Sequence, residues 1–193
     1  MSSTLRIAAV TSTLRHVLHE SLSSAEPGSF GGTEVTSVRP DQHIGRGALG
    51  DSAAGLNVFL YRVTSNEAWG PKDLPSRRAD GSRTQQTMTA LDLHYLVTAW
   101  GNDASLEEQR LLAHAVVALA GTPVLTRPVI TAAIAQYGVD DMAILATSDL
   151  AEQIEEIRVS PALLSLEEAS NLWRALSTPY LLSLAYTATF IRL

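Results

Sequence analysis

Two apolar segments separated by a polar one constrain the fold of this chain more than any other feature. Leu56–Val63 (LNVFLYRV) is apolar on both parities and rich in β-formers, which is typical of a strand covered on both faces. Met88–Trp100 (MTALDLHYLVTAW) carries apolar residues at every odd position from 91 to 99, so these share one face of a strand. Thr64–Thr87 between them is polar and aperiodic. We expect a long antiparallel hairpin with a long loop at about 64–87.

Four further segments predict helices. An apolar stripe at helical spacing marks the first, and Ser or Thr followed three residues later by Glu marks a capping box at two of the others. The expected helices are Thr4–Leu22, Leu106–Ala120 (capping box Ser105 and Glu108, with Gly121 as the stop at C′), a short one at Val129–Gln136, and Leu166–Leu176 (capping box Ser165 and Glu168).

Three weaker segments predict the remaining strands: Thr33–Pro40, Glu155–Val159 and Tyr180–Leu193. The 193 residues fit one domain, since that length buries a sufficient core without metal or disulfide. We therefore expect a single α/β (α+β) domain over 1–193, with a mixed, mostly antiparallel sheet flanked by helices.

Composition excludes several classes of function. The net charge is −6 and Lys72 is the single lysine, so no basic face is available to displace counterions from nucleic acid. The apolar stretches are shorter than the roughly 20 residues of a membrane span, and Arg6 and Arg15 interrupt the N-terminal one, which argues against a signal peptide. The chain has no cysteine, which suits a reducing compartment; we expect cytoplasmic synthesis and assembly.

One motif resembles a cofactor site. Gly45–Gly50 spells GRGALG, a formal match to the dinucleotide fingerprint, which works by turning a strand into a helix whose N-terminus holds the pyrophosphate. Here the glycines run through Asp51 and Gly55 into a strand. A flexible loop is the favoured interpretation, and no cofactor is expected.

Other polar residues have simple structural interpretations. His16, His19 and Glu20 could lie on neighbouring turns of the first helix, but a metal site needs a further converging ligand that the sequence does not nominate. His94 and His114 lie in apolar segments and are interpreted as packing histidines. No G-x-S-x-G elbow is present, and no catalytic or metal residue is predicted.

Several blocks occur in an order that resembles a known family. They are LNVFLYRVTSNEAW, DLPSRRADG, LDLHYLVTAWG, EEQRLLAHAVVAL, TPVL, LSLEEASNLW and TPYLLSLAY. Over roughly Leu5 to Arg192, they resemble the cap or tail-terminator subunits of bacterial contractile injection systems, which are phage-tail-like particles. The chain departs from the family pattern at Trp69, Trp100 and Leu181.

The resemblance implies a structural role. The chain would form a ring, expected to be a homohexamer, on the baseplate-distal end of the inner tube and sheath and would terminate their assembly. Its partners would be itself, sheath subunits and inner-tube subunits, and it would not be an enzyme. The alternatives are another structural subunit of the same particle, at the baseplate or at tube initiation, and a small nucleotide-binding enzyme using Gly45–Gly50.

The long loop is the candidate assembly interface, because Trp and Arg are the side chains that most often anchor interfaces. The alternative is a surface loop with no partner. The candidate residues are Trp69, Asp73, Leu74, Arg77, Arg78 and Arg83.

Overall fold

The predicted hairpin forms the centre of the structure, a computed structural model that describes residues 3–25, 30, 32–43, 54–66 and 89–192. The elements in chain order are the 3-10 helix η1 (Ser3–Leu5), α1 (Arg6–Ser23), β1 (Glu34–Thr36), η2 (Pro40–His43), β2 (Gly55–Ser65), β3 (Ala90–Trp100), η4 (Asp103–Ser105), α2 (Glu107–Gly121), β4 (Val124–Leu125), α3 (Arg127–Tyr137), η5 (Asp140–Thr147), η6 (Leu150–Glu152), β5 (Ile157–Ala162), α4 (Leu166–Ala175) and β6 (Ser183–Arg192).

The strands form one six-stranded sheet in the order β1-β2-β3-β6-β5-β4. β1 and β2 are parallel, and all other neighbours are antiparallel. The mixed, mostly antiparallel α/β fold expected from the sequence is therefore confirmed. β2 and β3 form the expected hairpin, with a register shift between Leu60 and Arg62. The hairpin extends beyond its expected end, since β2 continues to Ser65 and the Asn66 N–H bonds the Ala90 carbonyl at 2.9 Å.

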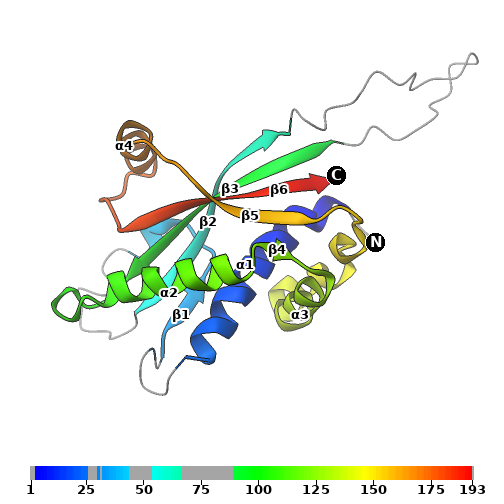
Figure 1. Cartoon of the computed structure of the whole chain (residues 1–193), viewed down its shortest axis with the longest axis horizontal. Coiled ribbons are helices and arrows are strands. Elements are labelled where there is room, and N and C mark those ends of the chain that lie inside the picture. Colours follow the sequence, from blue (N-terminus) through cyan, green and yellow to red (C-terminus); the bar gives the residue numbers. More distant parts are fainter. Residues whose placement is uncertain (1–2, 26–29, 31, 44–53, 67–88, 193) are drawn as a thin grey trace, which may run out of the picture.

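The helices cover the two faces of the sheet unequally. α1, α2 and α3 lie on one face, and α4 lies alone on the other (Figure 1). The odd-numbered apolar residues of β3 face the three-helix side, where they join residues of α1 and α2 in the main core. Leu93, Tyr95 and Ala99 are fully buried there. On the α4 side, Leu96 and Trp100 are also buried, so β3 is covered on both faces.

The start of α2 differs from the prediction. Ser105 belongs to the short 3-10 helix η4, and Leu106 follows it in the left-handed region, with a φ of 54°. The kink places Ser105 outside the N-cap position, so the predicted capping box of Ser105 and Glu108 is wrong. Glu107 acts instead: its carboxylate accepts the Asn102 N–H at 2.9 Å.

The position of Gly121 and both ends of β5 also differ from the prediction, and β5 begins at Ile157 rather than at Glu155. Gly121 is the last residue of α2, not a C′ residue beyond the helix, and Thr122 caps the end with a φ of −127°. β5 continues through Pro161 to Ala162, beyond the expected end at Val159, and pairs with the two-residue strand β4, which the sequence did not predict. The capping box of Ser165 and Glu168 is confirmed at α4.

Candidate functional site

The outer edge of β2 is the first surface with features of an assembly site. β1 pairs with β2 over Gly55–Asn57, and within the described residues no strand pairs with that edge from residue 58 to 65. The carbonyls of Ala54 and Leu56 accept hydrogen bonds from the β1 side, from Glu34 N–H at 3.1 Å and Thr36 Oγ1 at 3.5 Å. Because backbone groups alternate along a strand, Val58 and Leu60 direct theirs to the same open side.

A buried asparagine determines where the covered part of this edge ends. Asn57 is fully buried in β2. Its Oδ1 accepts the Val38 N–H at 3.0 Å and the Thr36 hydroxyl at 2.9 Å, and its Nδ2 donates to the Val38 carbonyl at 2.9 Å. The side chain thus replaces a strand partner for Val38. The chain then turns into η2, which leaves the rest of the β2 edge without a paired strand among the described residues.

The opposite side of the sheet is protected against strand addition. β4 covers the start of β5, and the Val159 N–H bonds the Pro123 carbonyl at 2.8 Å. Pro161 lies two residues further along β5, so its nitrogen faces the same outer side and has no hydrogen to donate. Proline on an edge strand blocks pairing with another chain. Within the described residues the two edges therefore differ, because Pro161 interrupts the β5 edge and no strand pairs with the β2 edge beyond Asn57.

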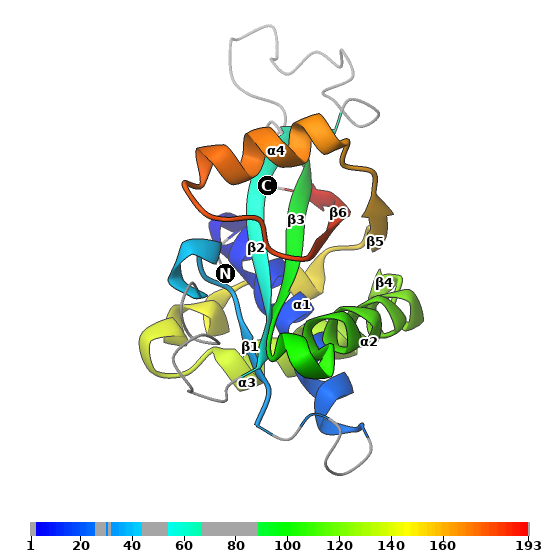
Figure 2. The same ribbon diagram turned by 90° about the vertical axis from the view of Figure 1, so that its left-hand side faces the viewer.

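A cleft of about 380 Å³ lies between α4 and the face of the sheet that α4 crosses. Figure 2 shows α4 crossing in front of the β2–β3–β6 face. His94 lines the cleft and lies within hydrogen-bonding distance of Thr64 (2.9 Å) and Thr187 (3.3 Å). Burial, together with Arg62, lowers the pKa of His94 below its ordinary value, so the ring is neutral at pH 7. These contacts confirm the packing interpretation of His94.

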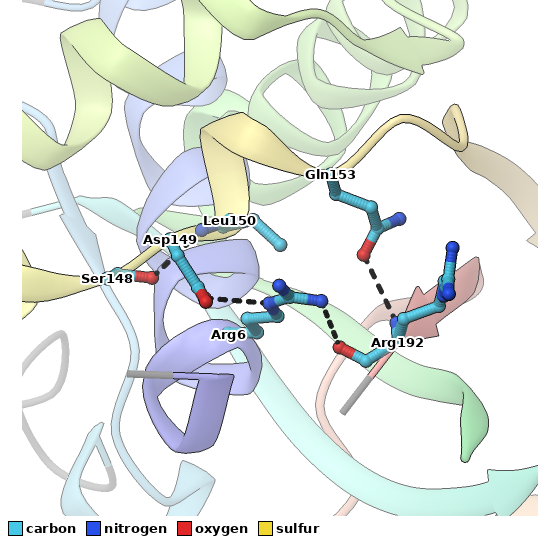
Figure 3. Close-up of polar contacts among 6 residues, drawn as sticks. All are labelled: Arg6, Ser148, Asp149, Leu150, Gln153 and Arg192. Carbon is cyan, nitrogen blue, oxygen red and sulfur yellow. Dashed lines mark hydrogen bonds and ion pairs between the residues drawn. The ribbon is translucent and has the colours of Figure 1, made fainter. Parts of the chain in front are cut away.

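A polar cluster joins the first helix to the end of the last strand (Figure 3). Arg6 Nε donates to Asp149 Oδ1 at 2.8 Å, and its Nη1 donates to the Arg192 carbonyl at 2.7 Å. Gln153 Oε1 accepts the Arg192 N–H at 3.1 Å, and Arg192 also pairs with Glu155. Because Arg6 bonds both Asp149, the residue before η6, and the end of β6, this cluster positions α1 against the sheet.

The Arg6–Asp149 pair predicts a measurable pH dependence of stability. The hydrogen bond from Arg6 lowers the pKa of Asp149 below its ordinary value of 3.8. A depressed carboxylate pKa stabilises the fold above the unfolded pKa, and this stabilisation is lost as the pH falls through the folded pKa. We expect Asp149→Asn to lower the free energy of unfolding by about 1–3 kcal/mol at pH 7, with the difference shrinking below pH 3.8.

Urea denaturation of both proteins from pH 7 to pH 3 measures that difference. Glu156→Gln is the matched control, because the Glu156–Arg158 pair is 61% and 65% exposed in its side chains and such pairs contribute little. A difference between the wild-type protein and Asp149→Asn that stays constant down to pH 3 would contradict the prediction.

The remaining residues that the sequence analysis singled out lie partly inside and partly outside the described residues. Trp69, Asp73, Leu74, Arg77, Arg78 and Arg83 lie outside the described residues, as does Gly45–Gly50. His16 and His19 both approach Gln136 of α3, at 2.5 and 3.4 Å. His114 lies 2.8 Å from the Ser21 hydroxyl and against the Phe30 ring, as a packing histidine. Across the described part of the chain, no three His, Asp or Glu side chains converge as metal ligands.

Sequence reasoning missed Asn57 and Arg6. The signal for Asn57 was a single amide within the apolar run LNVFLYRV, since a polar residue in such a strand is buried only with hydrogen-bonding partners. Arg6 carried no comparable signal, because its partners lie 143 and 186 residues away in the sequence.

Comparison with known proteins gives one family and a set of related structures. The model of the Pvc16 N-terminal domain family matches residues 9–193. A cryo-EM structure of the sheath/tube terminator of PVC, an extracellular contractile injection system, in its extended state aligns with a TM-score of 0.58 and 16% identity. The alignment covers 95% of this chain and 55% of that one. No curated protein sequence matches the chain.

A second structure, the tube-terminating cap of the anti-feeding prophage, aligns with a TM-score of 0.50 and 17% identity, over 84% of this chain and 48% of that one. The chain thus spans about half the length of these structural relatives. None of the helices in the described ranges is long and apolar enough to cross a membrane.

Proposed function

The chain belongs to the Pvc16 N-terminal domain family, and from this premise we propose that it is a structural terminator subunit of a contractile injection system. It binds the baseplate-distal end of the inner tube and sheath and ends their assembly. The observation that carries the proposal is the shared fold over 95% of this chain with a sheath/tube terminator. Residues 1–193 form a single terminator-like domain in this proposal.

The unequal sheet edges support the proposal. A terminator must bind the end of a growing assembly without offering a new end that continues it. Among the described residues, no strand pairs with the β2 edge from residue 58 to 65, so this edge can add a strand of a sheath or tube subunit, which is the geometry of β-strand addition. Pro161 blocks the corresponding addition on the β5 side. Such a subunit adds a strand at one edge of its sheet only.

The remaining features of the proposal follow from this structural role. The chain acts as a homohexameric ring, with sheath and inner-tube subunits as partners, and it uses no catalytic chemistry and no cofactor. It binds neither nucleic acid nor membrane, in keeping with its charge of −6, and it is made and assembled in the cytoplasm. The loop residues Trp69, Asp73, Leu74, Arg77, Arg78 and Arg83 form part of the contact with tube or sheath.

Electron microscopy of particles assembled with and without this chain tests the proposal. With the chain, we expect a density at the end opposite the baseplate and a narrow distribution of tube lengths. Without it, we expect uncapped ends and a broad length distribution. A label on the chain that appears at the baseplate would favour a baseplate or tube-initiating subunit. Thermal stabilisation that grows with nucleotide concentration would favour the nucleotide-binding alternative at Gly45–Gly50.

A further inference from the structure

Asn57 is a buried amide in a strand that is apolar around it. The side chain has no exposed surface, and both of its neighbours on β2 are buried and apolar. A buried amide costs free energy unless its donors and acceptors are bonded. Thr98 lies directly opposite on β3, and its buried hydroxyl has no hydrogen-bond partner among the described residues. Asn57 instead bonds residues 36 and 38, so its amide is directed at the end of β1 and the segment that follows.

The register of the parallel ladder shows which backbone groups that amide replaces. Thr36 of β1 lies opposite Asn57 of β2. In a parallel ladder, a residue donates to the carbonyl that precedes its partner and accepts from the N–H that follows it. If the ladder continued by two residues, the Val38 N–H would therefore bond the Val58 carbonyl, and the Leu60 N–H would bond the Val38 carbonyl.

The Asn57 side chain takes both of these bonds. Its Oδ1 accepts the Val38 N–H at 3.0 Å, and its Nδ2 donates to the Val38 carbonyl at 2.9 Å. One amide thus replaces a carbonyl and an N–H of β2, and side-chain bonds of this kind compete with the backbone ladder. Pro40 has no N–H and begins η2, so the step at Val38 is the last that this segment has to offer.

We propose that Asn57 is the positioning residue that keeps the β2 edge available for strand addition. It holds Val38 away from the first two backbone groups of that edge, the Val58 carbonyl and the Leu60 N–H. The role in assembly rests on the proposed function, in which a strand of a sheath or tube subunit adds at this edge. An apolar side chain of similar size would satisfy burial at position 57 and would leave Val38 to extend β1. The chain would then cover the start of its own edge.

Hydrogen exchange of the isolated chain, followed by NMR at single amides, tests how the edge is kept open. In the wild-type protein, we expect the Leu60 amide to exchange fast and the Phe59 amide, which points to β3, to exchange slowly. Asn57→Leu is expected to slow Leu60 exchange by at least about tenfold, because that N–H becomes bonded to the Val38 carbonyl. Thr98→Val is the matched control, since it removes a buried polar group with no hydrogen-bond partner among the described residues. It should leave the Leu60 rate unchanged.

Two further variants separate this role from a contribution to packing. Adding Val38→Pro to Asn57→Leu removes the N–H with which β1 would extend, so Leu60 exchange is expected to return to the wild-type rate. Asn57→Thr replaces Asn57→Leu if that variant does not fold, because a β-branched side chain suits a strand and a single hydroxyl cannot replace both bonds to Val38. A folded variant at position 57 with fast Leu60 exchange would overturn the inference. A wild-type Leu60 amide as protected as that of Phe59 would overturn it too.

Particle assembly tests the role in strand addition. Particles made with Asn57→Leu are expected to carry terminal density about tenfold less often than particles made with the wild-type chain, because a strand adds through main-chain bonds. Thr98→Val should match the wild-type chain. Slow Leu60 exchange with normal capping by Asn57→Leu would overturn the role of Asn57 and leave the proposed function standing. Particle ends that never carry the wild-type chain would overturn the proposed function and, with it, this role.

Discussion

Removal of Tyr180–Leu193 is expected to leave a chain with no cooperative unfolding transition. The segment contains β6, which lies between β3 and β5 and pairs with both. Its Tyr186, Ala188 and Ile191 are buried in the main core. A large apolar side chain contributes about 1.5–3 kcal/mol when buried, and a whole domain is stable by only about 5–15 kcal/mol. The free energy lost with a central strand and its core residues is therefore expected to exceed the free energy of unfolding of the domain.

Thermal melts followed by circular dichroism measure this effect, and two point variants provide the comparison if the truncated chain is insoluble. Ile191→Ala removes a fully buried side chain and is expected to cost about 2–5 kcal/mol. Leu184→Ala lies on the same strand but is 40% exposed, and its cost should be clearly smaller. A truncated chain that still melts cooperatively would show that β6 is not integral to the fold.

Gly55→Val is expected to destabilise the fold strongly through a backbone position that accepts no side chain. A Cβ at Gly55 would lie 2.1 Å from Cζ2 of Trp100 and 2.7 Å from the Glu34 carbonyl oxygen. Trp100 is buried, and Glu34 belongs to the paired strand β1, so neither can move freely. Inserting side-chain volume into a packed core costs about 1–3 kcal/mol, and sometimes more.

The urea midpoint measures the loss, and Gly121→Ala is the matched control. At Gly121 an added Cβ would meet nothing within 4 Å, and alanine favours the helix that Gly121 ends. We expect that variant to keep or raise the midpoint. Gly55→Val with an unchanged midpoint would show that β1 and Trp100 move apart at little cost.

The helices and the hairpin could be predicted because their signals are local. Alternating apolar residues in Met88–Trp100 define one strand face whatever the partner, and the capping box at Ser165 depends on two residues three positions apart. The same motif at Ser105 failed because Leu106 adopts a left-handed backbone, which reflects packing outside the motif. The bulge near Tyr61 is likewise set by pairing with β3. Local patterns carry no information on such register shifts.

The candidate assembly surfaces were less predictable, because they depend on strand order. Which edge lacks a paired strand among the described residues, and which edge Pro161 blocks, follows from the strand order β1-β2-β3-β6-β5-β4. The exposure of Leu166 was not predictable either, since its position on the apolar stripe of α4 indicates burial. The loop interface predicted from Trp69 and Arg77 lies outside the described residues and stays a prediction.

The bond between Arg6 and the Arg192 carbonyl spans 186 positions of the chain, and this has a consequence for synthesis. The ribosome makes α1 first, but its polar partner on β6 emerges after almost all of residues 1–193 have been translated. The pairing of β3 with β6 waits equally long. Long-range contacts of this kind slow folding because the loop between them must close first. The sheet is therefore expected to complete only after β6 has been translated, with the edges of β3 and β5 exposed to other nascent chains until β6 inserts between them.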